Sequence, residues 1–301
     1  IKDRSKVQNG KWYEGLPLWL LANRQGMLSA SYFWVGSDAN IHGEFPTYYK
    51  IYDTQVPHDV RVAQILEWLR LPKEQRPHFL TLYYSVVDSA GHEFGPESKE
   101  VRDAVLEVDR SLGELISGLA TLEKGGMPSH LIIVSDHGMK KIEKDKIVTI
   151  PKELLADDYI ITGRGAFSMI YTKSAEKTEE ALSLLKRVPH IKAYKRQEAP
   201  KEWHMDSELA GDIIILAEPG GYLTAEIDKK KSSGGTHGYD PAKSKEMGGI
   251  FIAQGPLIKN GKLGAIPNIN VYPFVAALLG LPLTDKIDGE LSVLKPYLIK
   301  K

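Results

Sequence analysis

Three short segments, far apart in the sequence, place aspartate or histidine beside glycine. They are Asp88-Ser-Ala-Gly-His92, Ser135-Asp-His-Gly-Met139 and Gly235-Thr-His-Gly238. One catalytic zinc usually takes three protein ligands and leaves a position open, whereas these segments offer five carboxylate or imidazole groups. Five groups fit a pair of metal ions that share one substrate, an arrangement that serves phosphoryl transfer. The candidate ligands are Asp88, His92, Asp136, His137 and His237.

Each segment alone has a second interpretation. Asp88 and His92 are four residues apart, and we expect a tight turn in which both side chains face one ion. A helix-capping aspartate beside an incidental histidine gives the same pattern. Asp136 and His137 directly follow an apolar run, where a polar turn at a strand end is equally consistent. The combination favours metal binding, because the chain has no cysteine and zinc also accepts carboxylate and imidazole.

The elements between these segments predict an open, mostly parallel α/β sheet with helices on both faces. Residues 79–87 form a nearly continuous apolar run, typical of a strand buried on both faces, and residues 131–134 form a second. Between them, residues 99–119 repeat apolar side chains at helical spacing, with Ser98 as the N-cap. Ligands bind beyond the carboxyl ends of the strands in such a βαβ unit. Further helices are expected at 16–25, 60–71, 175–187 and 268–279, and strands at 28–35, 166–171, 212–217 and 250–253.

The bulk composition excludes several classes of protein. The 301 residues contain 39 basic and 39 acidic side chains, so the formal net charge is zero and no nucleic-acid-binding surface is evident. The absence of cysteine excludes disulfides and thiolate metal sites. No run approaches the roughly 20 apolar residues that span a membrane, and residues 1–12 are too polar for a signal peptide. The basic loop at 229–235 is interpreted as solvated surface.

The three motifs, in this order, resemble those of the nucleotide pyrophosphatase/phosphodiesterase family of the alkaline phosphatase superfamily. The resemblance continues to the C-terminus but is poor at about 150–230. It is carried by Lys6-Val-Gln-Asn9, Phe33-Trp-Val-Gly-Ser-Asp38, Phe45-Pro46, Tyr52, Arg76-Pro-His-Phe79, Asp88-Ser-Ala-Gly-His-Glu-Phe-Gly-Pro96, Val134-Ser-Asp-His-Gly-Met139 and Gly235-Thr-His-Gly238.

The resemblance implies an alkaline-phosphatase-like fold and two zinc ions. One zinc would take Asp88, His92 and His237, and the other Asp136 and His137. In the family, the second zinc takes a further aspartate and contacts a threonine or serine nucleophile, both from a segment that precedes the matched residues.

Residues 1–30 contain no equivalent of that segment. We therefore expect residues 1–301 to form a single but incomplete catalytic domain, with its N-terminal strands missing and a less regular lobe at about 150–235. The second zinc would lack at least one ligand, the nucleophile would be absent, and the chain alone would turn over little substrate unless the upstream segment is supplied.

The activity implied by the resemblance is hydrolysis of phosphodiester or pyrophosphate bonds, with release of a nucleoside monophosphate through a covalent phospho-enzyme. In nucleotide-cleaving relatives, residues matching Trp34, Asp38 and Tyr52 line the substrate pocket, and the tyrosine stacks on the base. Ser85 departs from the pattern, since animal nucleotide-cleaving members carry an acid there. The resemblance also favours an exported protein, while the oligomeric state is not predicted.

Two alternatives remain open. A lysophospholipid or choline-phosphodiester hydrolase would use the same zinc ions with a different pocket. A non-catalytic module with structural zinc would instead require closed sites of four ligands. Phosphomonoester hydrolysis is less favoured, because the sequence shows no arginine placed to bind a terminal phosphate.

Overall fold

The computed structural model describes residues 4–224 and 234–299, and the chain divides into two compact units. Unit 1 comprises residues 1–85, 106–133 and 251–301, and unit 2 comprises residues 86–105 and 134–250. The basic loop expected at 229–235 falls, except for its last two residues, outside the described residues.

Unit 1 contains a parallel three-stranded sheet in the order β2-β1-β3. Its strands are β1 (Ser29–Tyr32), β2 (Tyr48–Lys50) and β3 (Phe79–Leu82). A further pair joins β4 (Leu131–Val134) to β13 (Phe251–Gln254). The parallel pairing around β1 agrees with the sheet predicted from the buried apolar runs.

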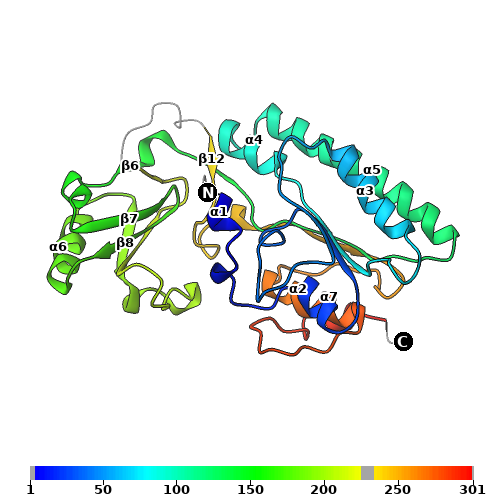
Figure 1. Cartoon of the computed structure of the whole chain (residues 1–301). Helices are drawn as coiled ribbons and strands as arrows, with labels where there is room; N and C mark the ends of the chain where they lie inside the picture. The colour runs from blue at the N-terminus through cyan, green and yellow to red at the C-terminus, as the bar shows by residue number, and fades with distance from the viewer. Residues whose placement is uncertain (1–3, 225–233, 300–301) are drawn as a thin grey trace. The chain divides into compact units, whose positions relative to one another are not determined.

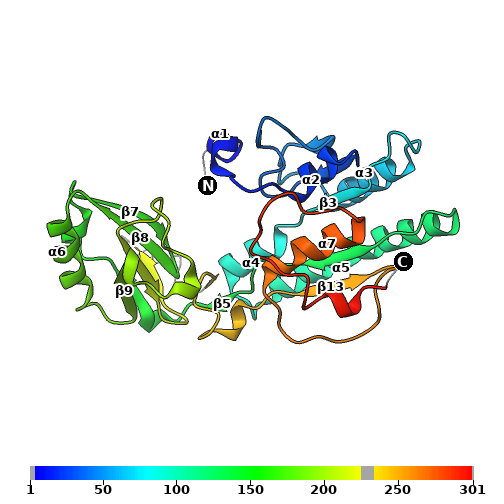
Figure 2. The same ribbon diagram turned by 90° about the horizontal axis from the view of Figure 1, so that it is seen from below.

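Helices pack on both faces of the three-stranded sheet (Figures 1 and 2). Ala30 and Tyr32 of β1 share a core with helices α3 and α5, whereas Phe79 of β3 faces helices α2 and α7. The residues alternate in this way because successive side chains of a strand point to opposite faces. These helices are α2 (Leu18–Arg24), α3 (His58–Arg70), α5 (Lys99–Lys124) and α7 (Val271–Leu279).

Unit 2 contains a four-stranded antiparallel sheet in the order β7-β8-β10-β9, with helix α6 (Ala175–Leu185) packed on it (Figure 1). The described residues between 150 and 224 are therefore more regular than the sequence predicts, since β7 and β9 were not expected. β9 reads Ile-Lys-Ala-Tyr-Lys, a lysine-rich alternation that resembles a surface loop. The strands are β7 (Tyr159–Arg164), β8 (Phe167–Thr172), β9 (Ile191–Lys195) and β10 (Ile213–Ala217).

Short elements complete the described chain. Two small pairs join β11 to β6 in parallel and β12 to β5 in antiparallel orientation. These strands are β5 (Lys140–Lys141), β6 (Ile147–Thr149), β11 (Tyr222–Thr224) and β12 (Gly235–Thr236). The short helices are α1 (Arg4–Val7), η1 (Gly10–Trp12), η2 (Lys144–Lys146), η3 (Lys152–Leu155), η4 (Arg196–Glu198), η5 (Lys201–Trp203), η7 (Lys245–Met247), η8 (Asn268–Asn270) and η9 (Lys295–Tyr297).

The expected strand at 79–87 is wrong in its second half. Strand β3 ends at Leu82, and helix α4 (Val86–Phe94) begins four residues later, in unit 2. A short apolar run cannot distinguish a strand from a buried helical turn by periodicity alone. Asp88 lies in the first turn of α4, where the positive end of the helix dipole favours a carboxylate. The Asp88–His92 segment is therefore helical and not the tight turn that the sequence suggested.

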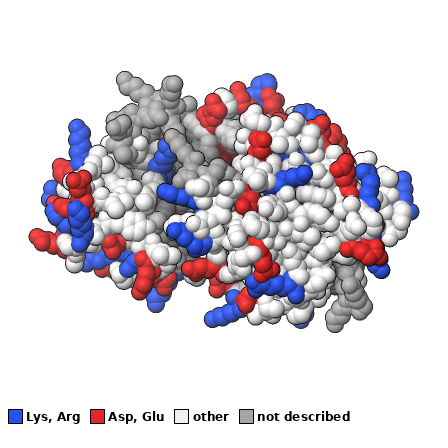
Figure 3. All heavy atoms as spheres, in the orientation of Figure 1, with Lys and Arg blue, Asp and Glu red and all other residues white. Residues whose placement is uncertain are grey.

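Charged side chains of both signs lie on the face of the molecule that Figure 3 shows. Figure 3 shows basic and acidic side chains intermixed on one face, in keeping with the formal net charge of zero. Within the described residues, no helix combines the length and apolarity that crossing a bilayer requires.

The antiparallel sheet should depend on its buried isoleucines. Ile215 in β10 is fully buried, whereas Ile160 in β7 of the same sheet is 65% exposed. Ile215→Ala should lower the free energy of unfolding by about 2–5 kcal/mol, because it removes buried methyl groups and leaves a cavity. Ile160→Ala should cost less than about 1 kcal/mol. Urea unfolding measures both, and equal losses would show that Ile215 is not part of a packed core.

Candidate metal centre

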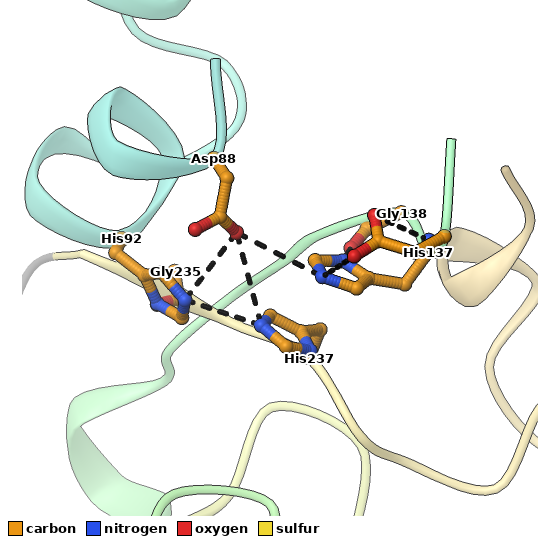
Figure 4. Close-up of polar contacts among 7 residues, drawn as sticks. Asp88, His92, His137, Gly138, Gly235 and His237 are labelled. Atoms are coloured by element: carbon orange, nitrogen blue, oxygen red, sulfur yellow. Dashed lines mark hydrogen bonds and ion pairs between the residues drawn. The ribbon is translucent and has the colours of Figure 1, made fainter. Parts of the chain in front are cut away.

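All five predicted ligands belong to unit 2, and the three histidines among them converge on one oxygen, Asp88 Oδ1 (Figure 4). The Nε2 atoms of His92, His237 and His137 lie 3.4, 3.7 and 3.9 Å from that oxygen. Asp136 joins the cluster through its Oδ2 atom, which lies 3.4 Å from His137 Nε2. The predicted convergence of distant segments is therefore present in the fold.

Three elements position these side chains. Asp88 and His92 lie one turn apart on α4, so that both project from the same face of the helix. Asp136 and His137 follow the end of β4, as predicted, and His237 follows β12. The chain before His237 packs tightly on α4, where a Cβ atom at Gly234 would overlap the carbonyl group of His92. Glycine at this position lets the backbone approach the helix closely enough to bring His237 to Asp88.

Backbone carbonyl groups orient two of the imidazole rings. His92 Nδ1 lies 3.0 Å from the carbonyl oxygen of Gly235, and His137 Nδ1 lies 2.8 Å from that of Gly138 (Figure 4). Because a carbonyl oxygen can only accept, each Nδ1 carries the hydrogen, and a neutral ring then presents the lone pair of Nε2 to Asp88. Metal-binding histidines are commonly held by this kind of hydrogen bond.

One feature of the cluster calls for a cation. Asp88 Oδ1 is buried and accepts no hydrogen bond among the described residues. A buried oxygen without a donor is unfavourable unless a positive charge lies close to it. The Nε2 atoms of His92 and His237 lie 3.2 Å apart, which is hydrogen-bond distance when His237 carries its hydrogen on Nε2. The oxygen and nitrogen donors present are those that zinc accepts when thiolate is absent.

The spacing of the donor atoms resembles a zinc site. Asp88 Oδ1 and the Nε2 atoms of His92 and His237 lie 3.2–3.7 Å from one another. Tetrahedral ligands at about 2.0–2.1 Å from zinc are separated by about 3.4 Å. Asp88, His137 and His237 also offer ligand atoms within 4.8 Å of one another, so Asp88 lies between two possible groups of ligands. His137 contacts Asp136, and we therefore group these two residues at a separate ion.

Burial lowers the pKa of His237, and the adjacent ring of His137 lowers it further. The two rings are stacked, with centroids 3.4 Å apart and planes 11° from parallel. The negative charge of Asp88 raises the pKa of His237 but does not outweigh these two effects. His237 is therefore held as a neutral imidazole, the form that binds a metal.

A cavity of about 440 Å³ adjoins the cluster within unit 2. It is lined by Asp88 and His92 and, beyond them, by Arg164 and Tyr222, neither of which was predicted from the sequence. No local signal identifies them, because Arg164 lies in a strand that was not expected. The lining residues are Asp88, Ser89, His92, Ile142, Arg164, Tyr222, Gly235 and Thr236.

The predicted substrate-binding residues lie in unit 1 and form a network of their own. Asp38 is buried, and its Oδ2 atom accepts hydrogen bonds from Gln8 Nε2 at 3.3 Å and from the backbone N–H of Tyr52 at 3.4 Å. Asp38 thus fixes the start of the segment that presents the Tyr52 ring.

Aromatic side chains continue this network. Tyr83 lies between the other two rings, with centroids 6.0 Å from Tyr52 and 6.5 Å from Trp34, both in edge-on geometry. The hydroxyl of Tyr52 donates to Ser85 Oγ at 3.0 Å. Trp34 is 38% exposed, so part of its ring is available to a ligand. Tyr83 was not predicted because it lies inside an apolar run that is typical of a buried strand.

Comparison with known proteins gives one consistent result. Residues 2–240 match the sequence profile of the type I phosphodiesterase / nucleotide pyrophosphatase family. A venom phosphodiesterase of Naja atra is 35% identical over 287 residues, covering 92% of this chain and 34% of the relative. Ectonucleotide pyrophosphatase/phosphodiesterase family member 1 of Mus musculus is 36% identical over 295 residues, covering 93% of this chain and 32% of the relative. The chain thus spans about a third of the length of these relatives.

Solved structures agree with this result. Murine ectonucleotide pyrophosphatase / phosphodiesterase 5 superposes with a TM-score of 0.89 at 30% identity, covering 98% of this chain and 78% of that one. One of its structures is an inactive threonine-to-alanine variant in complex with AMP. This similarity confirms the predicted fold class.

The environment of His237 predicts its titration. In metal-free protein, the His237 ring should titrate below its ordinary pKa of 6.5, because burial and His137 disfavour the imidazolium. The folded state then binds fewer protons than the unfolded chain just below pH 6.5, so lowering the pH through that range should destabilise the fold. An NMR titration of the His237 ring measures the midpoint, and a value at or above 6.5 would contradict the stacked, half-buried arrangement.

Proposed function

We propose, on the premise that this chain belongs to the type I phosphodiesterase / nucleotide pyrophosphatase family, that it supplies the zinc centre of an enzyme that hydrolyses phosphodiester or pyrophosphate bonds of nucleotides. The observation that carries the proposal is the convergence of three imidazoles on the buried oxygen of Asp88. The family match and the geometry support the same chemistry, the first through residues 2–240 and the second through the positions of a few atoms.

We assign the candidate ligands to two ions. Asp88, His92 and His237 would hold one zinc, and Asp136 and His137 would hold the other, together with at least one further ligand. Bound zinc would neutralise charge on the phosphoryl group and act as a Lewis acid. The protein orients His92 and His137 through the carbonyl groups of Gly235 and Gly138 and keeps His237 neutral.

The proposed reaction proceeds through a covalent phospho-enzyme. A threonine or serine hydroxyl would form a new bond to phosphorus while the bond to the leaving group breaks, and water would then release the nucleoside monophosphate. None of the residues 1–301 is assigned this nucleophilic role. The inactive threonine-to-alanine variant of the murine relative supports a hydroxyl nucleophile in this family.

We propose a nucleotide as the substrate. The murine relative has been obtained in complex with AMP, and this chain retains Trp34, Asp38 and Tyr52 in one hydrogen-bonded and aromatic network. A planar base stacks on such rings with roughly 1–3 kcal/mol per base. We also propose an exported location, since the relatives include venom proteins and an ectonucleotide pyrophosphatase.

Zinc binding provides the first test. The purified chain should bind zinc, and His237→Ala should weaken that binding by at least about tenfold, because even indirect partners of metal ligands have effects of that size. His78→Ala is the matched control, since His78 is an exposed histidine of unit 1. Calorimetric titration and the metal content of the purified variants measure the effect. Equal affinities in the two variants would remove His237 from the metal site.

Substrate turnover provides the second test. With a segment that supplies the nucleophile, added covalently or as a second chain, the protein should hydrolyse a p-nitrophenyl ester of a nucleoside monophosphate, and a chelator should abolish the reaction. Asp88→Asn should lower kcat/KM by about a hundredfold or more, because the cluster loses its central charge. A p-nitrophenyl ester of phosphocholine tests the alternative substrate class. Faster turnover of that ester would contradict the nucleotide assignment, and zinc binding without any turnover would favour a structural site.

A further inference from the structure

Arg164 brings a positive charge to the cavity beside the metal cluster. It is the last residue of β7 and lines the same cavity as Asp88 and His92. All of these residues belong to unit 2. The motifs in the sequence contain no arginine in a position to bind phosphate, so the fold adds a feature that they did not predict.

The backbone around Arg164 is firmly held. Arg164 pairs with Phe167 across the tip of the β7–β8 hairpin. Gly165 exchanges two backbone hydrogen bonds with Leu223, of 2.9 and 2.8 Å, and Ala166 accepts a third from Ala217 at 2.8 Å. Four segments of the chain therefore meet at this tip, and the backbone of Arg164 is held in place beside the cavity.

The tip also packs directly against the segment that carries His237. A Cβ atom at Gly165, where φ is +87°, would come within 2.9 Å of Thr236 Oγ1. Glycine is needed here for the backbone conformation and for this close approach. The arginine is consequently positioned by the same local packing that positions a metal ligand.

The guanidinium group of Arg164 has no competing acidic partner in the part of the chain that the structure describes. Its side chain is exposed, and among the described residues it takes part in no salt bridge. Asp88 is the one acidic residue in the described lining of the cavity, and its ion-pair partners are histidines. An unpaired arginine in a cavity is available to an anionic ligand, and its planar fork matches two oxygens of a phosphate.

We propose that Arg164 binds a second phosphate group of the substrate, one that does not undergo attack. The inference rests on the proposed function, in which the zinc ions already neutralise the reacting phosphoryl group. A cavity of about 440 Å³ is large enough for more than a single phosphate. The substrate class is then a nucleotide with a pyrophosphate linkage or a further terminal phosphate. A choline ester is disfavoured, because its cationic headgroup would face the guanidinium.

Binding of inert nucleotides tests this assignment without turnover. The zinc-loaded 301-residue chain should bind a nucleoside methylene-diphosphonate at least about tenfold more tightly than the corresponding monophosphate, in line with one charge-assisted pair. Arg164→Ala should remove most of that preference, and Arg164→Lys should retain part of it because the charge remains. The control is Lys192→Ala, which removes an exposed cation of β9 in the same sheet but outside the cavity lining. Isothermal titration calorimetry gives each dissociation constant.

The outcomes separate the inference from the proposed function. Normal zinc uptake with an unchanged preference in Arg164→Ala would overturn the role of Arg164 alone. Equal weakening of both nucleotides would also overturn it, because Arg164 would then bind the phosphate that both ligands share. Failure of the unmodified chain to bind zinc would overturn the proposed function and the inference with it. Loss of the preference in Lys192→Ala as well would overturn the role of Arg164, because the preference would then depend on general surface charge.

Discussion

The buried oxygen of Asp88 is the constraint around which the candidate site is arranged. It lacks a hydrogen-bond donor among the described residues, and three imidazole nitrogens face it at 3.4–3.9 Å. A buried carboxylate oxygen without a donor is costly, and neutral imidazoles that present lone pairs to it increase that cost. A positive charge at the cluster would remove this cost. The metal-binding interpretation is therefore supported by electrostatics as well as by the types of the residues.

The scaffold meets this requirement with local packing. Helix α4 supplies two candidate ligands one turn apart, and the chain around Gly234 passes so close to the helix that only glycine fits. The carbonyl group of Gly235, two residues before His237, orients His92. Each of these segments thus helps to position another. A substitution in one segment should therefore shift the side chains of the others. The clustering of all five side chains within unit 2 agrees with this mutual dependence.

Much of this could be predicted from the sequence, and the errors have physical reasons. The spacing of polar residues after apolar runs indicated five side chains that the fold brings together, and a parallel sheet. The predicted family membership is confirmed. The helical state of Asp88 and His92 was missed, because Val86 and Val87 continue an apolar run that suits a strand as well as a helix. Strands β7 and β9 were missed because glycine and lysine interrupt their apolar pattern. Arg164 could not be found without β7, since its relation to the metal cluster exists only in the folded chain.

A neutral protein must attract a charged substrate over short distances. With a net charge of zero and intermixed surface charges (Figure 3), long-range steering of a nucleotide is weak. Among the described residues that line the cavity, Arg164 carries a permanent positive charge, and a bound metal would add to it. These two sources act on different parts of a ligand. The metal interacts with any phosphodiester, whereas a fixed arginine distinguishes a leaving group that bears phosphate from one that is neutral or cationic. Selectivity among phosphodiesters can therefore change through the hairpin that carries Arg164 while the metal ligands stay the same.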